Sequence, residues 1–372
     1  MTSKINTYVA VQHFLDENYT GHIWIKGYDA DGKPIEEIHQ HQSELMRAER
    51  SGSYTAADGT HLERKVFKSP YHRKKYIETE LEGQTVYNSL QPDKEFLFNN
   101  FFDRAADNSF NSHPLKTYMI DIETEVGDEF PQPDTALQPI LLITVHDSTD
   151  GRFHVFVNHK NYTPDPRPDT DYHVHKTEVM MLSAFGRFMS QHPPDVISGW
   201  NIDGFDIPYI MNRMRQFFSD ADLADMLSPA HRKDFKRYKT SGKDGREINT
   251  YRIEGINIID YLPLYKKFTV ASGSRQSYSL EYISQYELGV GKLEHGYESF
   301  KEFYTKDFST FVKYNITDVE RCRDLEAKLK FIGLTVKICT IGLTPYENIM
   351  KSIPYIFGMI LIKARLENLY LR

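Results

Sequence analysis

The N-terminal part of the chain alternates apolar and polar residues, a pattern typical of β-strands with one buried face. The runs that show this alternation most clearly are INTYVAVQHFL and HIWIKGYDADGKPIEEI. In the second run Asp31-Gly32 separates two alternating stretches, which predicts a β-hairpin. We therefore expect residues 1–112 to form an N-terminal α+β domain that opens with strands.

The composition shifts near NSHPLKTYMIDIE, and we expect a second domain over residues 113–333. Its pattern predicts strands at residues 117–123, 139–147 and 152–158. A loop follows, NYTPDPRPDTDYH, whose prolines 164, 166 and 168 are expected to prevent regular structure.

Helices are predicted to alternate with further strands after this loop. Thr177 is expected to cap an amphipathic helix over residues 178–190, and a second helix is expected from about Pro208. DVISGWN predicts a short strand between them, and Asp244-Gly245 predicts the turn of another hairpin. The remaining predicted helices cover residues 279–287 and 308–332. Strands followed by interleaved helices predict an α/β fold, a mixed sheet flanked by helices.

Residues 334–372 contain strongly apolar stretches such as IPYIFGMILIKARL, but they are too few to build a core of their own. We expect this return segment to pack back on the N-terminal domain or to meet a partner, because an exposed apolar surface usually marks an interface.

The composition agrees with a globular protein of two or three domains. The 372 residues are 40% hydrophobic and 26% charged, with neither a signal-like leader nor a run long enough to span a membrane. Two cysteines, Cys322 and Cys339, exclude a disulfide framework and a cysteine-based zinc site, and a reducing cytoplasm is the expected location. The net charge of −7 argues against nonspecific coating of nucleic acid, but it allows acidic residues that hold cations.

Two acidic residues stand together at the end of a predicted strand. In TYMIDIETE, alternation places Asp121 and Glu123 on one face and Ile122 on the other. Like charges side by side are repulsive and costly to desolvate, so this arrangement needs an explanation.

Further acidic residues embedded in apolar sequence explain why Asp121 and Glu123 stand together. Asp206 in GFDIP precedes a predicted helix, where it could also act as a cap, and Tyr314 and Asp318 are four residues apart and share a helix face. Buried carboxylates are costly unless they bind cations, and a cluster of them can hold two divalent ions. Such a pair clamps the attacking water and the leaving 3′ oxygen of a phosphodiester.

These residues resemble the three exonuclease motifs of family B DNA polymerases, in the tyrosine subclass of the DEDD 3′–5′ exonucleases. The motifs are Asp121-Ile122-Glu123, Asn201-x-x-x-Phe205-Asp206 and Tyr314-x-x-x-Asp318, and the successive aspartates 121, 206 and 318 are 85 and 112 positions apart. GWNIDGFDIPYIMNR, LPLYKKF and SYSLEYIS are similar to the T-even-type bacteriophage replicative polymerases. The similarity extends more weakly over residues 1–112 and beyond residue 333.

The resemblance implies an RNase H-like exonuclease domain with a site for two divalent metal ions, magnesium or manganese. Asp121, Glu123 and Asp318 would bind the metal that activates water. Asp121 would bridge to the second metal, with Asp206 helping to hold it. Tyr314 would hydrogen-bond the attacking water or the scissile phosphate.

The resemblance also implies contacts with single-stranded DNA 3′ ends and primer–template DNA. Phe130 would wedge against the bases of a frayed primer end, and Asn201 with the neighbouring Phe205 would position the strand. Lys266 or Lys267 would neutralise charge in the transition state. The hairpin at residues 235–253 would help to hold primer and template apart.

DNA synthesis is not expected from this chain alone. Asp169-Thr170-Asp171 matches the short aspartate motif of the family's palm, but it lies in the proline-rich loop and precedes the second exonuclease motif, so we interpret it as a coincidence. The expected role is the proofreading part of a polymerase that acts with a separate polypeptide carrying palm, fingers and thumb.

Two alternatives remain open. One is a free-standing DEDD nuclease that acts on RNA or DNA. The other is a non-catalytic assembly protein whose basic stretch at residues 61–76, HLERKVFKSPYHRKKY, contacts RNA. The histidine pairs His39/His41 and His173/His175 lack further zinc ligands and are interpreted as loop residues.

Overall fold

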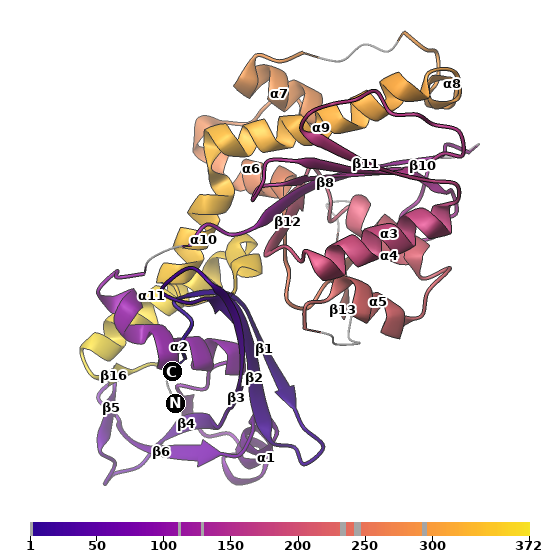
Figure 1. Cartoon of the computed structure of the whole chain (residues 1–372). Coiled ribbons are helices and arrows are strands. Elements are labelled where there is room, and N and C mark those ends of the chain that lie inside the picture. The colour runs from indigo at the N-terminus through magenta and orange to yellow at the C-terminus, as the bar shows by residue number, and fades with distance from the viewer. Residues whose placement is uncertain (1–2, 111–112, 128–129, 231–235, 242–246, 292–295) are drawn as a thin grey trace. The chain divides into compact units, whose positions relative to one another are not determined.

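A computed structural model describes residues 3–110, 113–127, 130–230, 236–241, 247–291 and 296–372 (Figure 1). The chain divides into two compact units. The N-terminal unit consists of Met1–Pro114 together with Gly333–Arg372, and the central unit consists of Leu115–Ile332.

The N-terminal unit contains two small sheets. The first is antiparallel, with strands β1 (Thr7–Leu15), β2 (Gly21–Tyr28) and β3 (Pro34–Gln40) in that order. The Asp-Gly hairpin prediction is confirmed, since β2 pairs with β3 and Gly32 has a φ of +77°, which glycine adopts readily. The second sheet has the order β16-β5-β6-β4-β7. Its strands are β4 (Ser43–Ala48), β5 (Tyr54–Ala56), β6 (His61–Phe67), β7 (Val86–Tyr87) and β16 (Leu369–Tyr370).

The last forty or so residues belong to this unit through specific contacts. The Tyr8 hydroxyl donates to the carbonyl oxygens of Cys339 and Thr344, at 3.1 and 3.0 Å, and β16 pairs in parallel with β5. Lys94 donates to the Pro354 carbonyl at 2.6 Å, and burial lowers its pKa to about 8. The helices of the unit are α1 (Pro70–Glu80), α2 (Pro92–Ala106), α10 (Phe331–Ile341), which starts at the unit boundary, η2 (Tyr346–Met350) and α11 (Ser352–Leu366).

A six-stranded mixed sheet forms the centre of the second unit, with the order β11-β10-β9-β8-β12-β15. The strands are β8 (Thr117–Thr124), β9 (Ile140–Asp147), β10 (Phe153–Asn158), β11 (Thr170–His175), β12 (Val196–Gly199) and β15 (Asn257–Asp260). Strand β8 lies inside the sheet, antiparallel to β9 and parallel to β12. The α/β prediction is therefore confirmed.

Helices cover both faces of this sheet (Figure 1). One face packs on α3 (Glu178–Gln191), α4 (Asp206–Met214) and α5 (Asp220–Leu227), which share a core with β8, β9 and β12. Across the other face runs α9 (Phe308–Leu329), in contact with β8 and β9. The remaining helices are α6 (Tyr261–Thr269), η1 (Val270–Ser272), α7 (Leu280–Leu288) and α8 (Phe300–Lys306). Thr177 caps α3 as predicted, by accepting from the Met180 N–H.

The proline-rich loop was predicted to be irregular to its end, and this prediction was wrong. The prolines stop at Pro168, and residues 170–175 alternate and pair in parallel with β10. His173 and His175 therefore lie on β11, and His39 lies on β3, so these histidines are not loop residues. Within the Asp169-Thr170-Asp171 sequence, Asp171 binds Arg152 through two hydrogen bonds of 2.7 and 2.6 Å.

One helix boundary differs from the predictions, and one predicted turn lies outside the described residues. The helix expected over residues 308–332 ends at Leu329, because Lys330 adopts a φ of +56° and α10 begins directly after it. The predicted second hairpin is present as β13 (Lys236–Ser241) paired with β14 (Glu247–Arg252), but its turn at residues 244–245 lies outside the described residues. Within the part of the chain that the structure describes, no helix is both long and apolar enough to cross a membrane.

Candidate active site

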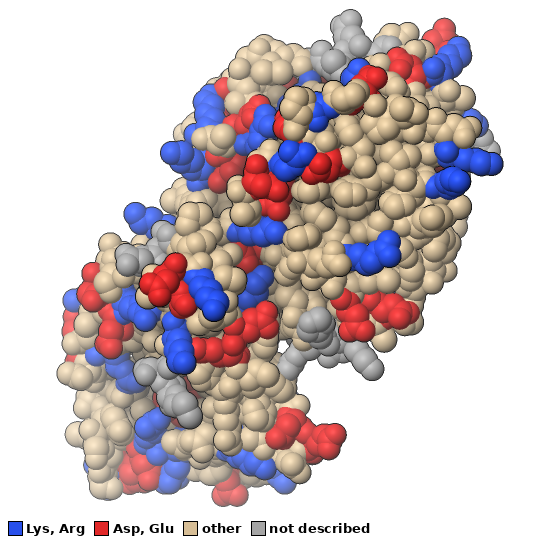
Figure 2. Space-filling model, viewed as in Figure 1, with Lys and Arg blue, Asp and Glu red and all other residues tan. Residues whose placement is uncertain are grey.

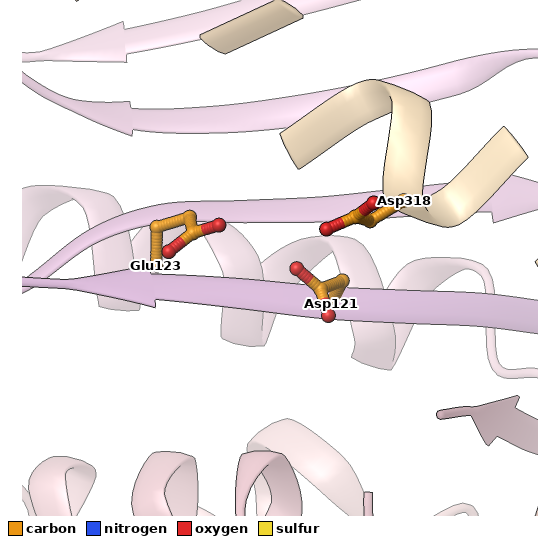
Figure 3. Close-up of side chains that lie close together, drawn as sticks. All are labelled: Asp121, Glu123 and Asp318. Atoms are coloured by element: carbon orange, nitrogen blue, oxygen red, sulfur yellow. The ribbon is translucent and has the colours of Figure 1, made fainter. Parts of the chain in front are cut away.

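Three carboxylates converge between strand β8 and helix α9 (Figure 3). Asp121 and Glu123 project from the same face of β8, while Ile122 between them is buried in the core on the other side. Asp318 comes from α9, which crosses this face. One carboxylate oxygen from each of the three residues lies within 4.8 Å of the others. Residues almost two hundred positions apart in the sequence therefore form one acidic cluster.

The carboxylates of the cluster differ in what holds them. Asp121 Oδ2 accepts a hydrogen bond of 2.6 Å from Asn315 Nδ2, and Asp318 Oδ1 forms a 2.9 Å ion pair with Arg321. Arg321 is 4% exposed and also donates to the Gly291 carbonyl at 2.6 Å, so its guanidinium is fixed. Glu123 has no hydrogen bond from any residue that the structure describes.

Burial and mutual repulsion make these groups hard to ionise together. Burial raises the pKa of Asp121 well above its usual range, and repulsion from Asp206, Glu123 and Asp318 adds to this effect. The pKa of Glu123 is raised well above its usual value in the same way. Burial raises the pKa of Asp318 to about 6, although Arg321 opposes the shift. A divalent cation would relieve this repulsion, and carboxylate oxygens are the ligands that Mg²⁺ and Mn²⁺ prefer.

Asp206 lies beside the cluster but is not one of the three converging groups. It is the first residue of α4, and its Oδ1 accepts the Ile122 N–H at 3.0 Å. The N-cap position of α4 belongs to Phe205 and not to Asp206. Capping of its own helix therefore does not describe the hydrogen bond that the Asp206 carboxylate accepts from Ile122. Burial raises the pKa of Asp206 to about 7.

Tyr314 lies one helical turn before Asp318 on α9. Its ring packs edge-on against Phe300 and Phe303, with centroids 5.8 and 6.0 Å away. Burial raises the pKa of Tyr314, and the charges of Asp318, Glu123 and Asp121 raise it further. The hydroxyl is therefore near the cluster and stays protonated at neutral pH.

The loop that carries Asn201 is organised by an aspartate that the sequence analysis missed. Asp260, at the end of β15, accepts the backbone N–H groups of Asn201, Asp203 and Leu262, each at 3.0 Å. Asn201 adopts a left-handed φ of +66°, which these bonds stabilise. Burial raises the pKa of Asp260 to about 6 and that of Asp203 to about 7. The signal in the sequence is an acid that ends the apolar run NIID directly before a helix.

Most of the residues predicted to contact DNA lie around this loop. The Phe130 and Phe205 rings are 5.9 Å apart, and Phe130 is 72% exposed. Asn201 is exposed as well. On α6, the Lys266 ammonium lies 4.7 Å from the centre of the Tyr278 ring, and its charge lowers the pKa of Asp260, which places it beside the loop. Lys267 follows on the same helix.

Comparison with known proteins shows the family to which the sequence is similar. The model of the family described as DNA polymerase family B, exonuclease domain, matches residues 69–283. The matched region includes Asp121, Glu123 and Asp206, whereas Tyr314 and Asp318 lie beyond it and join the site through α9.

Viral DNA polymerases are among the similar proteins. The chain is 34% identical to the DNA-directed DNA polymerase of Escherichia phage RB69 over 245 residues, which cover 60% of this chain and 26% of that protein. It is 31% identical to the DNA-directed DNA polymerase of Enterobacteria phage T4 over 256 residues, which cover 63% of this chain and 28% of that protein. It is 28% identical to the DNA polymerase of Orgyia pseudotsugata multicapsid polyhedrosis virus over 255 residues, which cover 67% of this chain and 25% of that protein. The chain thus spans about a quarter of the length of these relatives.

Proposed function

The chain belongs to the exonuclease-domain family of family B DNA polymerases, and on this basis we propose that its central unit is a metal-dependent 3′–5′ exonuclease acting on DNA. The observation that carries the proposal is the convergence of Asp121, Glu123 and Asp318, whose carboxylate oxygens lie within 4.8 Å of one another. Together with Tyr314 on the same helix as Asp318, this set provides cation ligands and a hydroxyl donor at one place.

The carboxylates fit a pair of Mg²⁺ or Mn²⁺ ions. Asp121, Glu123 and Asp318 would hold one ion, and Asp121 with Asp206 would hold the second. When bound, such ions lower the pKa of a water molecule and stabilise the charge on the leaving 3′ oxygen. Burial and repulsion raise the pKa values of these carboxyls, and bound cations would offset both effects.

The other residues would bind and orient the DNA end. The Tyr314 hydroxyl stays protonated and would donate a hydrogen bond to the attacking water or to the scissile phosphate. Phe130 and Phe205 offer an aromatic surface on which a terminal base would stack. Asn201 would position the strand from its fixed loop. Lys266, beside that loop, is favoured over Lys267 as the cation that would face the phosphate.

Digestion of 3′-labelled single-stranded DNA tests this proposal. The purified chain should release label with Mg²⁺ and not with EDTA, and the Asp121→Ala/Glu123→Ala variant should be about a hundredfold slower or more, since metal ligands are worth several kcal/mol. Asp225→Ala is the matched control, because Asp225 is an exposed acid on α5, across the sheet. Equal digestion by parent and double variant would overturn the assignment of the site.

At the level of the whole protein, we propose that this activity serves proofreading during DNA synthesis by a separate polypeptide with palm, fingers and thumb. Support comes from α11, where Ile353, Ile356 and Ile360 are 80%, 47% and 50% exposed at helical spacing. Such an apolar stripe is typical of an interface. Primer extension by the chain alone should give no product.

The structure refines how the interface should be tested. Deleting residues 340–372 would remove the Thr344 carbonyl that binds Tyr8 and strand β16, and so would damage the N-terminal unit itself. Ile353→Asp/Ile356→Asp changes only exposed positions. This variant should lose binding to a palm-bearing polypeptide and keep its exonuclease rate; unchanged binding would contradict the proposed interface.

RNA binding by the basic stretch 61–76 stays a prediction, and the ion pairs that several of its basic residues form give it little support. Arg64 pairs with Glu44, Lys65 with Glu63, and the buried Arg73 with Glu95. Figure 2 shows basic and acidic side chains interspersed on the visible face of the N-terminal unit, rather than a field of one sign. Neutralised cations contribute little to binding of a phosphate backbone.

A further inference from the structure

A buried pair of uncharged residues lies directly behind Asp121. Asn315 of α9 donates from Nδ2 to Asp121 Oδ2 at 2.6 Å, and Thr144 of β9 donates its hydroxyl to Asn315 Oδ1. Thr144 and Asn315 are both 0% exposed. Thr144 is also the partner of Asp121 in the register between β8 and β9. The buried side-chain amide of Asn315 thus connects α9, the helix that carries Asp318, to both β8 and β9.

The orientation of this amide follows from chemistry. An ionised carboxylate, the form that binds a cation, only accepts hydrogen bonds, so it selects the NH₂ end of Asn315. The oxygen end then faces Thr144, whose hydroxyl donates to it. Turning the amide over would place its oxygen against the carboxylate of Asp121, which is repulsive. Both polar ends of Asn315 are therefore used inside the protein, and its side chain is not available as a cation ligand.

We propose that Asn315, oriented by Thr144, is a positioning residue that fixes the Asp121 carboxylate for binding divalent cations. The proposal rests on the proposed function, since it gives these residues a role at that site. The single hydrogen bond uses one lone pair of Oδ2 and leaves Oδ1 free of this contact. Partners behind a ligand that fix its orientation commonly change metal affinity or activity by about 10–100-fold when removed.

A purely structural role makes a different prediction. Buried hydrogen bonds stabilise a fold whether or not a metal binds, and removing one partner costs about 1–3 kcal/mol. If Asn315 only joined α9 to the sheet, its loss would lower the unfolding temperature and leave the cation affinity of the folded protein unchanged. Cation affinity therefore separates the two roles.

Four variants of the full chain test the proposal. Asn315→Leu keeps approximate size and removes both hydrogen bonds, and Thr144→Val removes the hydroxyl at constant shape. Thr144→Ser restores the hydroxyl. Val312→Ala is the matched control, because Val312 is a buried residue of α9 without a polar group, so its loss weakens the same helix without removing a donor.

The primary readout is Mn²⁺ binding to the DNA-free protein by calorimetry, with thermal unfolding of the metal-free protein alongside. Asn315→Leu should weaken Mn²⁺ binding by about 10-fold or more, and Thr144→Val by a smaller factor. A fifth variant that combines Thr144→Val with Asn315→Leu should bind Mn²⁺ no more weakly than Asn315→Leu alone, since the Thr144 hydroxyl acts through the Asn315 amide. Thr144→Ser and Val312→Ala should bind within about twofold of the parent, well inside the 10-fold expected for loss of positioning.

Mn²⁺ affinity within about twofold of the parent for Asn315→Leu would overturn the positioning role, because it falls well short of the expected 10-fold loss. Additive effects of Thr144→Val and Asn315→Leu would overturn the part assigned to Thr144. The proposed function fails in a distinguishable way, because then the parent itself would bind Mn²⁺ no better than Asp121→Ala/Glu123→Ala.

Discussion

The carboxylate of Asp206 accepts a hydrogen bond from the backbone N–H of Ile122, 3.0 Å away. Ile122 lies between Asp121 and Glu123 on β8, so this bond joins the start of α4 to the acidic strand at the level of the cluster. It also fixes a buried carboxyl whose pKa is raised to about 7 beside three others that resist ionisation. The site is therefore built from groups that destabilise the metal-free protein when they are charged.

Replacing Asp206 should reveal this cost. A carboxyl whose pKa is raised in the folded state contributes stability below its unfolded pKa and loses it as the pH rises through the folded value. Asp206→Asn keeps an oxygen for the Ile122 N–H and removes the charge. Relative to the parent, the metal-free variant should therefore gain on the order of 1–3 kcal/mol above about pH 7, and little near pH 4.

Denaturant unfolding of both proteins at several pH values measures this difference. Comparing parent with variant removes the contributions of other groups, such as His154 and His173, whose pKa values burial lowers. Exonuclease activity should fall in the same variant. A variant that is less stable than the parent at high pH would show that the charge of Asp206 is compensated inside the protein.

Divalent cations should stabilise the folded protein, and most strongly where the carboxyls are ionised. At about a hundredfold excess over its dissociation constant, Mg²⁺ should add about 2.7 kcal/mol to the free energy of unfolding. Thermal unfolding with Mg²⁺ and with EDTA measures the effect, and Asp121→Ala/Glu123→Ala should lose most of it. The same upward shift in the double variant would place the cation elsewhere.

Tyr314→Phe should distinguish the contribution of the Tyr314 hydroxyl to the reaction rate from the contribution of its ring to packing. The ring keeps its packing on Phe300 and Phe303, so the unfolding temperature should change little. The single-turnover rate should fall by about tenfold or more, because a hydrogen bond to the reacting phosphate or water is lost. Rates equal to the parent at saturating Mg²⁺ would remove Tyr314 from the chemistry.

Replacing Asp260 should weaken the binding of DNA and leave the binding of metal ions nearly unchanged. Asp260→Ala removes the acceptor of three partly buried backbone N–H groups, so the loop should lose the contacts that hold it. The KM for DNA should rise while Mn²⁺ affinity stays near that of the parent. Asp260→Asn, which retains one acceptor oxygen, should be milder. Unchanged KM in Asp260→Ala would show that the loop of Asn201 does not position the strand.

Local periodicity explains what the sequence could predict. A strand has a period of two, which places Asp121 and Glu123 together, and a helix places Tyr314 next to Asp318. Thr177 as a cap and Asp31-Gly32 as a turn are equally local signals, and the structure confirms both. Strand β11 is hard to recognise in the sequence because it is short and directly follows three prolines, which favour irregular structure.

What the sequence could not show are contacts that local patterns do not encode. The bond from Ile122 to Asp206 joins residues 84 positions apart, and the bond from Asn315 to Asp121 joins residues 194 positions apart. The three bonds of Asp260 depend on a loop in which Asn201 takes a left-handed conformation. Such contacts depend on how the elements pack, so they become visible only in three dimensions.

The central claim is that the cluster of Asp121, Glu123 and Asp318 hydrolyses DNA from its 3′ end with divalent cations. Its most direct measurement is a time course on 5′-labelled single-stranded DNA, resolved at single-nucleotide length. With Mg²⁺ the parent should give a ladder of labelled products that shortens stepwise from the 3′ end, and Asp121→Ala/Glu123→Ala should leave the DNA intact. Release of short labelled fragments at the outset, or the same ladder from the double variant, would contradict the account.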